Sequence, residues 1–108
     1  MIKEEAIETA LAYLRSSADE AASARANVRY LAEFLKSKKA QLASNFSGSV
    51  ASAEMRALAD PAYLEILDGY RVAVEEDAFH QFKREAAVAT IDAWRTQQSN
   101  ARAEGRVG

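Results

Sequence analysis

Apolar side chains recur at helical spacing along the first 43 residues of the chain. No proline or glycine interrupts residues 3–43, and acidic side chains occupy the first turns, where the helix dipole favours negative charge. Most steps between apolar positions are three, four or seven residues, as in a coiled-coil seam. The seam comprises Ile7, Leu11, Leu14, Ala18, Ala21, Val28, Leu35 and Leu42, widened by Ala24 and Leu31. This pattern predicts one long helix over about residues 3–43.

The periodicity stops in the middle of the chain. Serine, asparagine and glycine cluster in residues 45–52, which predicts a loop between helices. A short helical segment follows over about residues 53–59, with Ser52 as its expected cap.

A second long helix is predicted to begin at Pro61. Asp60 is a good capping residue, and proline is tolerated at the first helical position because it has no backbone N–H to leave unpaired. The expected apolar stripe is Tyr63, Leu67, Tyr70, Val74, Ala78, Val88 and Ile91. We therefore expect a helix over about residues 61–100, with Gly69 as its weakest point, and a frayed tail over residues 101–108.

Two long helices joined by a short connection are expected to lie antiparallel. If Ala43 lies near Pro61 across the turn, blocks of opposite charge face each other along the pair. The blocks are Glu4, Glu5 and Glu8 with Arg95 and Arg102; Asp19 and Glu20 with Lys83 and Arg84; Arg25 and Arg29 with Glu75, Glu76 and Asp77; and Lys36, Lys38 and Lys39 with Glu65 and Asp68. Each exposed pair contributes only about 0.2–1 kcal/mol, so the pattern predicts the alignment more than the stability.

The stretch SSADEAASARAN, residues 16–27, has no apolar side chain larger than alanine. The same register places these alanines, among them Ala18 and Ala22, opposite Phe79 and Phe82. Close packing favours a small residue facing a large one. We therefore expect a waist, a narrow stretch of the first helix whose alanines leave room for both phenylalanine rings. Alternatively, the alanines allow two copies of the first helix to approach closely.

The second helix carries another apolar face, which a single hairpin leaves uncovered. Its members are Leu64, Val72, Phe79, Phe82 and Ala86. Since symmetric dimers are the commonest closed assemblies, we expect a homodimer in which these residues form the interface of an elongated four-helix bundle. A compact monomer bent at Gly69 is the alternative.

Composition narrows the picture to a single helical domain, residues 1–108, without cysteine chemistry. The chain has 24 alanines and no cysteine, which excludes disulfides, thiolate metal sites and cysteine nucleophiles. No apolar run is long enough to span a membrane, and the acidic N-terminus is unlike a signal peptide, so we expect a cytoplasmic protein without a membrane partner. The net charge of -2 argues against a protein that coats nucleic acid.

Motifs for catalysis or cofactor binding are missing from the sequence. His80 is the single histidine, and we interpret it as an ordinary, partly buried residue. Glu75, Glu76 and Asp77 are consecutive on a helix and point in three directions, unlike the spaced oxygen ligands of a cation site. We therefore expect no enzyme activity, cofactor, metal or small-molecule substrate.

Two surfaces have side chains suited to binding a macromolecule. The basic residues of the first helix are a possible nucleic-acid site: Arg25, Arg29, Lys36, Lys38 and Lys39. Tyr30 and Phe34 lie on a different side of that helix and, with Trp94, form a possible docking surface for another protein. A dimer interface that buries these aromatics, and a solvated, salt-bridged basic face, are the alternatives.

Three segments resemble a group of small all-helical proteins of tailed bacteriophages and prophages. They are YLAEFLKSKKAQL (30–42), ADPAYLEIL (59–67) and IDAWRTQQSNAR (91–102). The resemblance rests on Tyr30, Leu31, Lys36, Ser37, Ala40, Pro61, Tyr63, Trp94, Arg95, Ser99 and Asn100. It implies a phage or prophage accessory protein in the cytoplasm of a bacterial host, often encoded among recombination and replication genes.

These observations together predict a non-enzymatic binding protein. Its expected partner is a protein of phage recombination, replication or host takeover. Direct binding of nucleic acid and inhibition of a host defence enzyme are the alternative functions.

Overall fold

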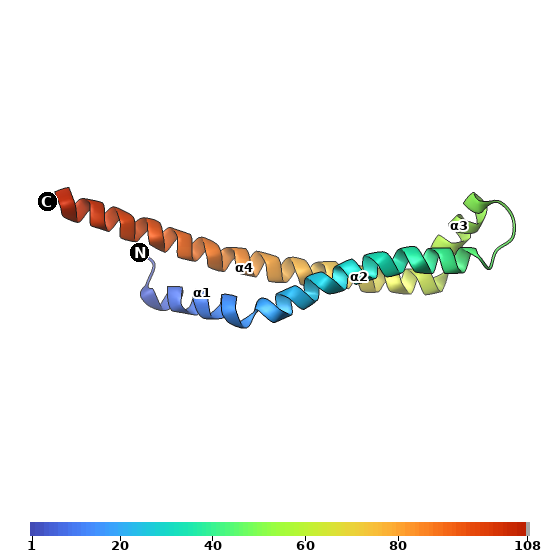
Figure 1. The fold of residues 1–108 in the computed structure, drawn as a ribbon, viewed down its shortest axis with the longest axis horizontal. Coiled ribbons are helices and arrows are strands. Elements are labelled where there is room, and N and C mark those ends of the chain that lie inside the picture. The colour runs from blue at the N-terminus through green and yellow to red at the C-terminus, as the bar shows by residue number, and fades with distance from the viewer. Residues whose placement is uncertain (108) are drawn as a thin grey trace. The chain divides into compact units, whose positions relative to one another are not determined.

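The computed structural model describes residues 1–107, and side chains as far as Gly105. It contains four helices: α1 (Glu4–Ser16), α2 (Ala18–Ala43), α3 (Val50–Ala59) and α4 (Pro61–Val107) (Figure 1). Residues 1–107 contain no strand. The all-α fold and the antiparallel helical hairpin that the sequence predicts are therefore confirmed.

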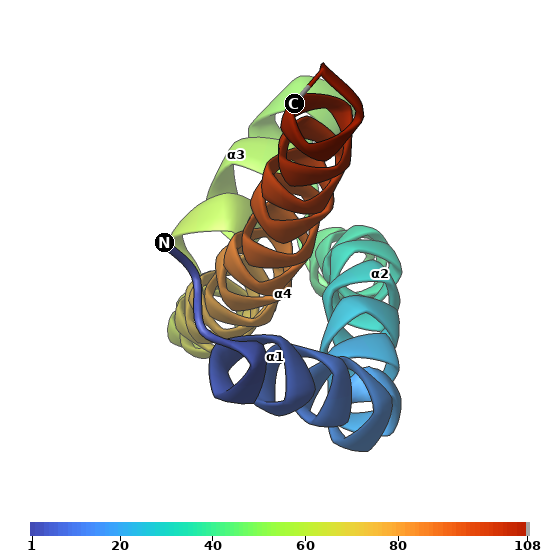
Figure 2. The ribbon, with the colours of Figure 1, turned by 90° about the vertical axis from the view of Figure 1, so that its left-hand side faces the viewer.

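The contacts of the chain divide it into two compact units. In the first unit, residues 1–21 lie along the part of α4 that begins at Phe79, and the Ile2 N–H donates to Gln97 Oε1 at 3.1 Å (Figure 2). The second unit, Ala22–Ala78, contains the rest of α2, the whole of α3 and the start of α4. Both α2 and α4 thus contribute residues to each unit.

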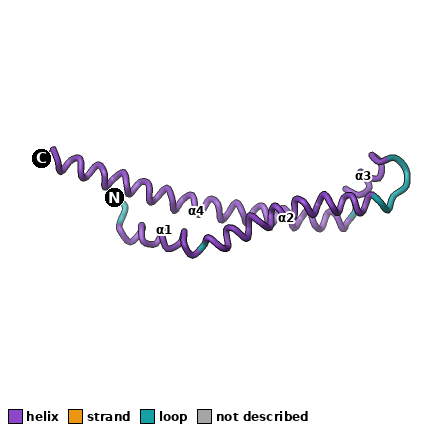
Figure 3. The backbone as a smooth tube through the Cα atoms, viewed as in Figure 1, coloured by secondary structure: helices purple, strands orange, loops and turns teal. Residues whose placement is uncertain are grey.

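The helix predicted over residues 3–43 is divided at Ser17, a correction to the sequence analysis (Figure 3). The Leu14 carbonyl and the Ser17 Oγ both accept hydrogen bonds from Arg84 Nη1, at 2.9 and 2.7 Å. A side-chain donor that bonds a helix carbonyl offers it an alternative to its usual backbone partner, which is a common origin of kinks. The serine-rich stretch is therefore the place where α4 holds the junction between α1 and α2.

The turn between α2 and α3 is shorter than predicted. The loop covers residues 44–49, so α3 begins at Val50 instead of residue 53. Ser49, not Ser52, is the N-cap, because the Ser49 Oγ accepts a hydrogen bond from the Ser52 N–H at 3.1 Å. Gly48 has a φ of 108°, a conformation that glycine adopts at little cost.

The helix start predicted at Pro61 is confirmed. Asp60 Oδ1 accepts a hydrogen bond from the Ala62 N–H at 2.8 Å, and Pro61 is the first residue of α4. The expected end near residue 100 is wrong, since α4 continues to Val107; alanine and arginine favour helix even without burial. The helix is also unbroken at Gly69, which contradicts the alternative of a compact monomer bent there.

The core of the chain is thin because alanine fills most of it. Five of the seven buried hydrophobic residues within residues 1–105 are alanines, and no large side chain there is fully buried. Along α1 and α2, an unbroken series of buried and half-buried positions advances by three and four residues. It consists of Ile7, Ala10, Leu14, Ser17, Ala21, Ala24, Val28, Leu31, Leu35, Lys38 and Leu42. The predicted seam is thus right except at Leu11 and Ala18, which are exposed.

The stripe predicted for α4 is right at Tyr63, Tyr70, Ala78 and Ile91, which are half-buried, and wrong at its other three positions. Its members Leu67, Val74 and Val88 are each at least 40% exposed. The series that faces the other helices also advances by three and four residues, but it contains polar side chains. It consists of Tyr63, Ile66, Tyr70, Ala73, Asp77, His80, Arg84, Ala87, Ile91 and Trp94. Apolar periodicity does not identify this series because its middle positions, Asp77, His80 and Arg84, are polar.

The register in the first unit differs from the predicted one by about one helical turn. Arg84 bonds to Leu14 and Ser17 instead of Asp19 and Glu20. The expected waist is also wrong, since Phe79 and Phe82 are 60% and 67% exposed and are not taken in by the alanines. In the second unit, the predicted pairing of Arg25 with Asp77 is present, with Nε to Oδ1 at 3.5 Å.

Replacing Gly69 with alanine is expected to stabilise the protein. A Cβ atom at this position meets no atom within 4 Å, and alanine is favoured over glycine in a helix interior by about 1 kcal/mol. Urea unfolding followed by circular dichroism measures the change. Gly48→Ala is the matched control: its positive φ makes the same substitution destabilising, so a change of equal sign in both variants would contradict this account.

Candidate interaction surfaces

Tyr30 and Phe34 form an exposed aromatic pair on α2. Their positions four residues apart place the side chains on neighbouring turns of one helix face. The ring centroids lie 5.9 Å apart with an interplanar angle of 27°, and the residues are 63% and 38% exposed. The structure therefore presents two large apolar rings, already ordered against each other, to solvent.

Trp94, the third aromatic of the predicted docking surface, lies in the other unit. It is half-buried in the inner series of α4. Together with Arg95, Gln98 and Arg102 it lines a cavity of about 330 Å³. Tyr30 and Phe34 thus contact each other, whereas Trp94 lies among different residues and is not part of the pair.

The predicted basic site is partly neutralised by acidic side chains. Arg25 pairs with Asp77 of α4, and Lys36 pairs with Glu33 at 3.2 Å within α2. Within the part of the chain that is described, Arg29, Lys38 and Lys39 form no ion pair. These three residues are the cations of α2 that the chain itself leaves uncompensated.

The five residues predicted for the dimer interface are all exposed: Leu64, Val72, Phe79, Phe82 and Ala86. All five belong to α4, Leu64 and Val72 in the second unit and the other three in the first. The homodimer and this interface stay predictions.

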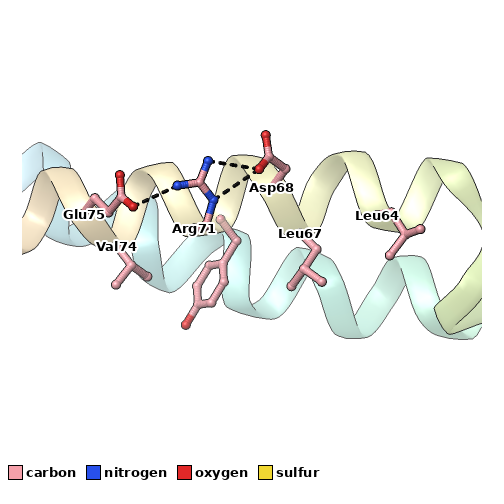
Figure 4. A pocket seen from close by; sticks show the side chains of 7 residues that line it. Leu64, Leu67, Asp68, Arg71, Val74 and Glu75 are labelled. Carbon is pink, nitrogen blue, oxygen red and sulfur yellow. Dashed lines mark hydrogen bonds and ion pairs between the residues drawn. The ribbon is translucent and has the colours of Figure 1, made fainter.

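A groove along α4, which the sequence analysis missed, contains Leu64 together with Leu67, Tyr70 and Val74 (Figure 4). Its volume is about 580 Å³. Sequence reasoning had assigned Leu67, Tyr70 and Val74 to the intrachain seam. The buried and half-buried series of α4 instead passes through Ile66 and Ala73, each one residue before Leu67 and Val74. Its continuation through Asp77, His80 and Arg84 is polar, so apolar periodicity does not reveal it.

Three charged side chains form a ladder along one edge of this groove. Arg71 donates to Asp68 Oδ1 at 3.1 and 3.2 Å and to Glu75 Oε1 at 2.8 Å. The hydrogen bond to Asp68 raises the pKa of the Arg71 guanidinium above its ordinary value, and the charge of Glu75 adds to the effect. Figure 4 shows the apolar side chains pointing away from this ladder, so the groove has one apolar and one charged edge.

A second cavity, of about 440 Å³, lies between α1 and α4 in the first unit. Lys83 Nζ lies 4.7 Å from the centroid of the Tyr13 ring and 5.7 Å from that of Phe79. The Tyr13 hydroxyl is buried and has no hydrogen-bond partner. The other lining residues are Glu5 and several alanines and threonines.

Within residues 1–107, no group of three or more potential ligands is placed to hold a metal ion, and His80 lies edge-on to Phe79 with ring centroids 5.8 Å apart. No helix in this range is both long and apolar enough to cross a membrane.

Searches against protein families, curated protein sequences and solved structures each found no match to this chain.

Proposed function

We propose that this chain is a non-enzymatic helical protein that binds another protein through Tyr30 and Phe34. The observation that carries the proposal is the exposure of this stacked pair on a regular helix. Aromatic side chains dominate the binding energy of many protein interfaces because each covers a large area with few rotatable bonds. A ring pair held by its own helix loses little conformational freedom on binding.

The proposed setting is a phage or prophage accessory protein in a bacterial cell. The support for it is the resemblance of residues 30–42, 59–67 and 91–102 to such proteins. Within that setting, the partner is a protein of phage recombination, replication or host takeover. Inhibition of a host defence enzyme would use the same kind of contact.

Removing the aromatic pair is expected to abolish binding of the partner. Tagged wild-type protein and the double variant Tyr30→Ala, Phe34→Ala are compared for proteins retained from a bacterial lysate, and the retained protein is then purified and titrated. Two interface anchors are expected to contribute at least about 2 kcal/mol together, which is roughly a 30-fold loss of affinity.

The control for this experiment is the double variant Val50→Ala, Met55→Ala. These apolar side chains on α3 are 76% and 72% exposed, so they are more exposed than the aromatic pair and belong to a different helix. Equal affinity of the wild-type protein and the aromatic variant for the purified partner would refute the proposal.

Nucleic-acid binding is the second candidate function, because Arg29, Lys38 and Lys39 are uncompensated cations. Reversal of all three charges to Glu is expected to abolish binding to labelled single- or double-stranded DNA, measured by fluorescence anisotropy. For duplex DNA the logarithm of the association constant should fall with the logarithm of salt concentration by about 0.9 for each phosphate contacted. No binding by the wild-type protein at low salt would exclude this function.

A further inference from the structure

The strongest unexplained surface of the molecule is the α4 groove of Leu64, Leu67 and Val74. These residues are 48%, 41% and 40% exposed, although the seven buried hydrophobic residues within residues 1–105 include only two larger than alanine. With Arg71, they follow one another at steps of three, four and three residues, the spacing of a second coiled-coil seam beside the intrachain one. A seam with this spacing fits another helix.

The two long helices of the second unit carry opposite charge. Residues 22–43 of α2 contain five basic side chains and one acidic side chain, a net charge of +4. Residues 61–78 of α4 contain five acidic side chains and one basic side chain, a net charge of -4. Two α4 helices would therefore repel each other, whereas an α2 helix from another copy complements α4.

Little of this complementarity is used within the chain. Arg25 and Asp77 form an ion pair between α2 and α4. In the described range, Glu65 and Glu76 of α4, like Arg29, Lys38 and Lys39 of α2, take part in no ion pair. These five charges, two acidic and three basic, are thus left for a partner.

We propose that a second copy of this chain docks its α2 helix in the α4 groove. A two-fold axis parallel to the helices gives a four-helix bundle in which α2 of each copy lies antiparallel to α4 of the other. Asp68 and Glu75 are seven residues apart, as are Arg29 and Lys36. An antiparallel pairing therefore brings Asp68 to Lys36 of the second copy and Glu75 to Arg29 at the same time. Asp68 and Glu75 already bond Arg71, and Lys36 bonds Glu33, so these contacts extend existing ion pairs into a network between the copies.

The apolar sides of the two helices also match. Ala32 lies three residues after Arg29 and four before Lys36, on the same face of α2. The leucines of the groove thus meet an alanine and the aliphatic stems of two long cations. Tyr30 and Phe34 lie on a different side of α2, so this interface is independent of the proposed protein-binding surface.

Measurement of mass in solution tests the dimer. Light scattering coupled to size exclusion is expected to give twice the 11.8 kDa of the chain. Leu67→Glu places a charge in the seam and is expected to weaken dimerisation at least about tenfold. Met55→Glu, at an exposed apolar position on α3, is the control and should leave the mass unchanged. A monomeric wild-type protein, or a dimer unaffected by Leu67→Glu, overturns the proposal.

Charge reversal tests which helices meet. The variant Arg29→Glu, Lys36→Glu and the variant Asp68→Lys, Glu75→Lys should each dimerise at least about tenfold more weakly alone. When mixed, they should form a heterodimer, since both of its α2–α4 contacts then pair opposite charges. A mixture that stays monomeric while both variants remain helical overturns this pairing.

A cysteine experiment covers the case in which charge reversal unfolds a variant. The chain has no cysteine, so Lys36→Cys and Asp68→Cys introduce single thiols. On mixing and oxidation, these two variants should cross-link faster than a control mixture of Tyr30→Cys with Asp68→Cys. Equal rates in the two mixtures contradict the proposed arrangement.

Discussion

Replacing Arg84 with alanine is expected to lower the free energy of unfolding by about 2 kcal/mol. The side chain donates to the Leu14 carbonyl and to the hydroxyl of Ser17, a residue only 6% exposed. Hydrogen bonds from a charged donor contribute about 1.5–3 kcal/mol, and their loss leaves two acceptors at the α1–α2 junction without this partner. Urea unfolding measures the total loss, and hydrogen exchange of the amides near Ser17 should show faster local opening.

Two further variants separate this role from a general loss of positive charge. Arg95→Ala removes an exposed arginine that pairs with Asp92 of the same helix, at 3.8 Å. The free energy of unfolding is expected to change by less than about 0.5 kcal/mol. Arg84→Lys keeps the charge but lacks the planar guanidinium, so it should fall between wild type and Arg84→Ala. Equal losses for Arg84→Ala and Arg95→Ala would show that Arg84 does not hold the junction.

Leu35→Ala is expected to destabilise the second unit by about 2–3 kcal/mol. Leu35 is 8% exposed and is one of only two buried hydrophobic residues larger than alanine within residues 1–105. Truncation of a buried leucine loses its transfer free energy and leaves a cavity. Thermal and urea unfolding by circular dichroism measure the loss.

The matched control is Leu58→Ala in the same unit. Leu58 is 44% exposed, so the same truncation there removes less buried area and should cost less than about 1 kcal/mol. If both variants lost the same stability, the surface around Leu58 would have to be covered in solution, and the thin intrachain core would be wrong.

The helices were predictable because their signals are local. Periodicity without proline or glycine predicted the long helices, and Asp60 with Pro61 fixed a helix start to the residue, since capping and φ restriction depend only on neighbours along the chain. The errors at element ends have local causes too. Ser49 and Ser52 are both plausible caps, and an exposed alanine-rich tail has no sequence signal that stops a helix.

The interaction surfaces were predictable only in part. Tyr30 and Phe34 were identified because residues four apart on one helix must be neighbours, whatever the rest of the chain does. The α4 groove was missed because Leu67 and Val74, two members of the apolar stripe expected in the core, are exposed. Asp77, His80 and Arg84 occupy the inner seam, and no rule based on hydrophobicity places them there.

The sequence by itself determined an all-helical hairpin, the start of α4 and the aromatic pair, because these depend on contacts within a few residues. The tertiary structure alone decided the break at Ser17 and the face that α4 turns inward. At the break, Arg84 reaches across from α4 and bonds groups 70 and 67 residues away in sequence, a contact that no local pattern encodes. The inner series of α4 includes the polar residues Asp77, His80 and Arg84, whereas Leu67 and Val74 are exposed and line the surface where we place the second copy.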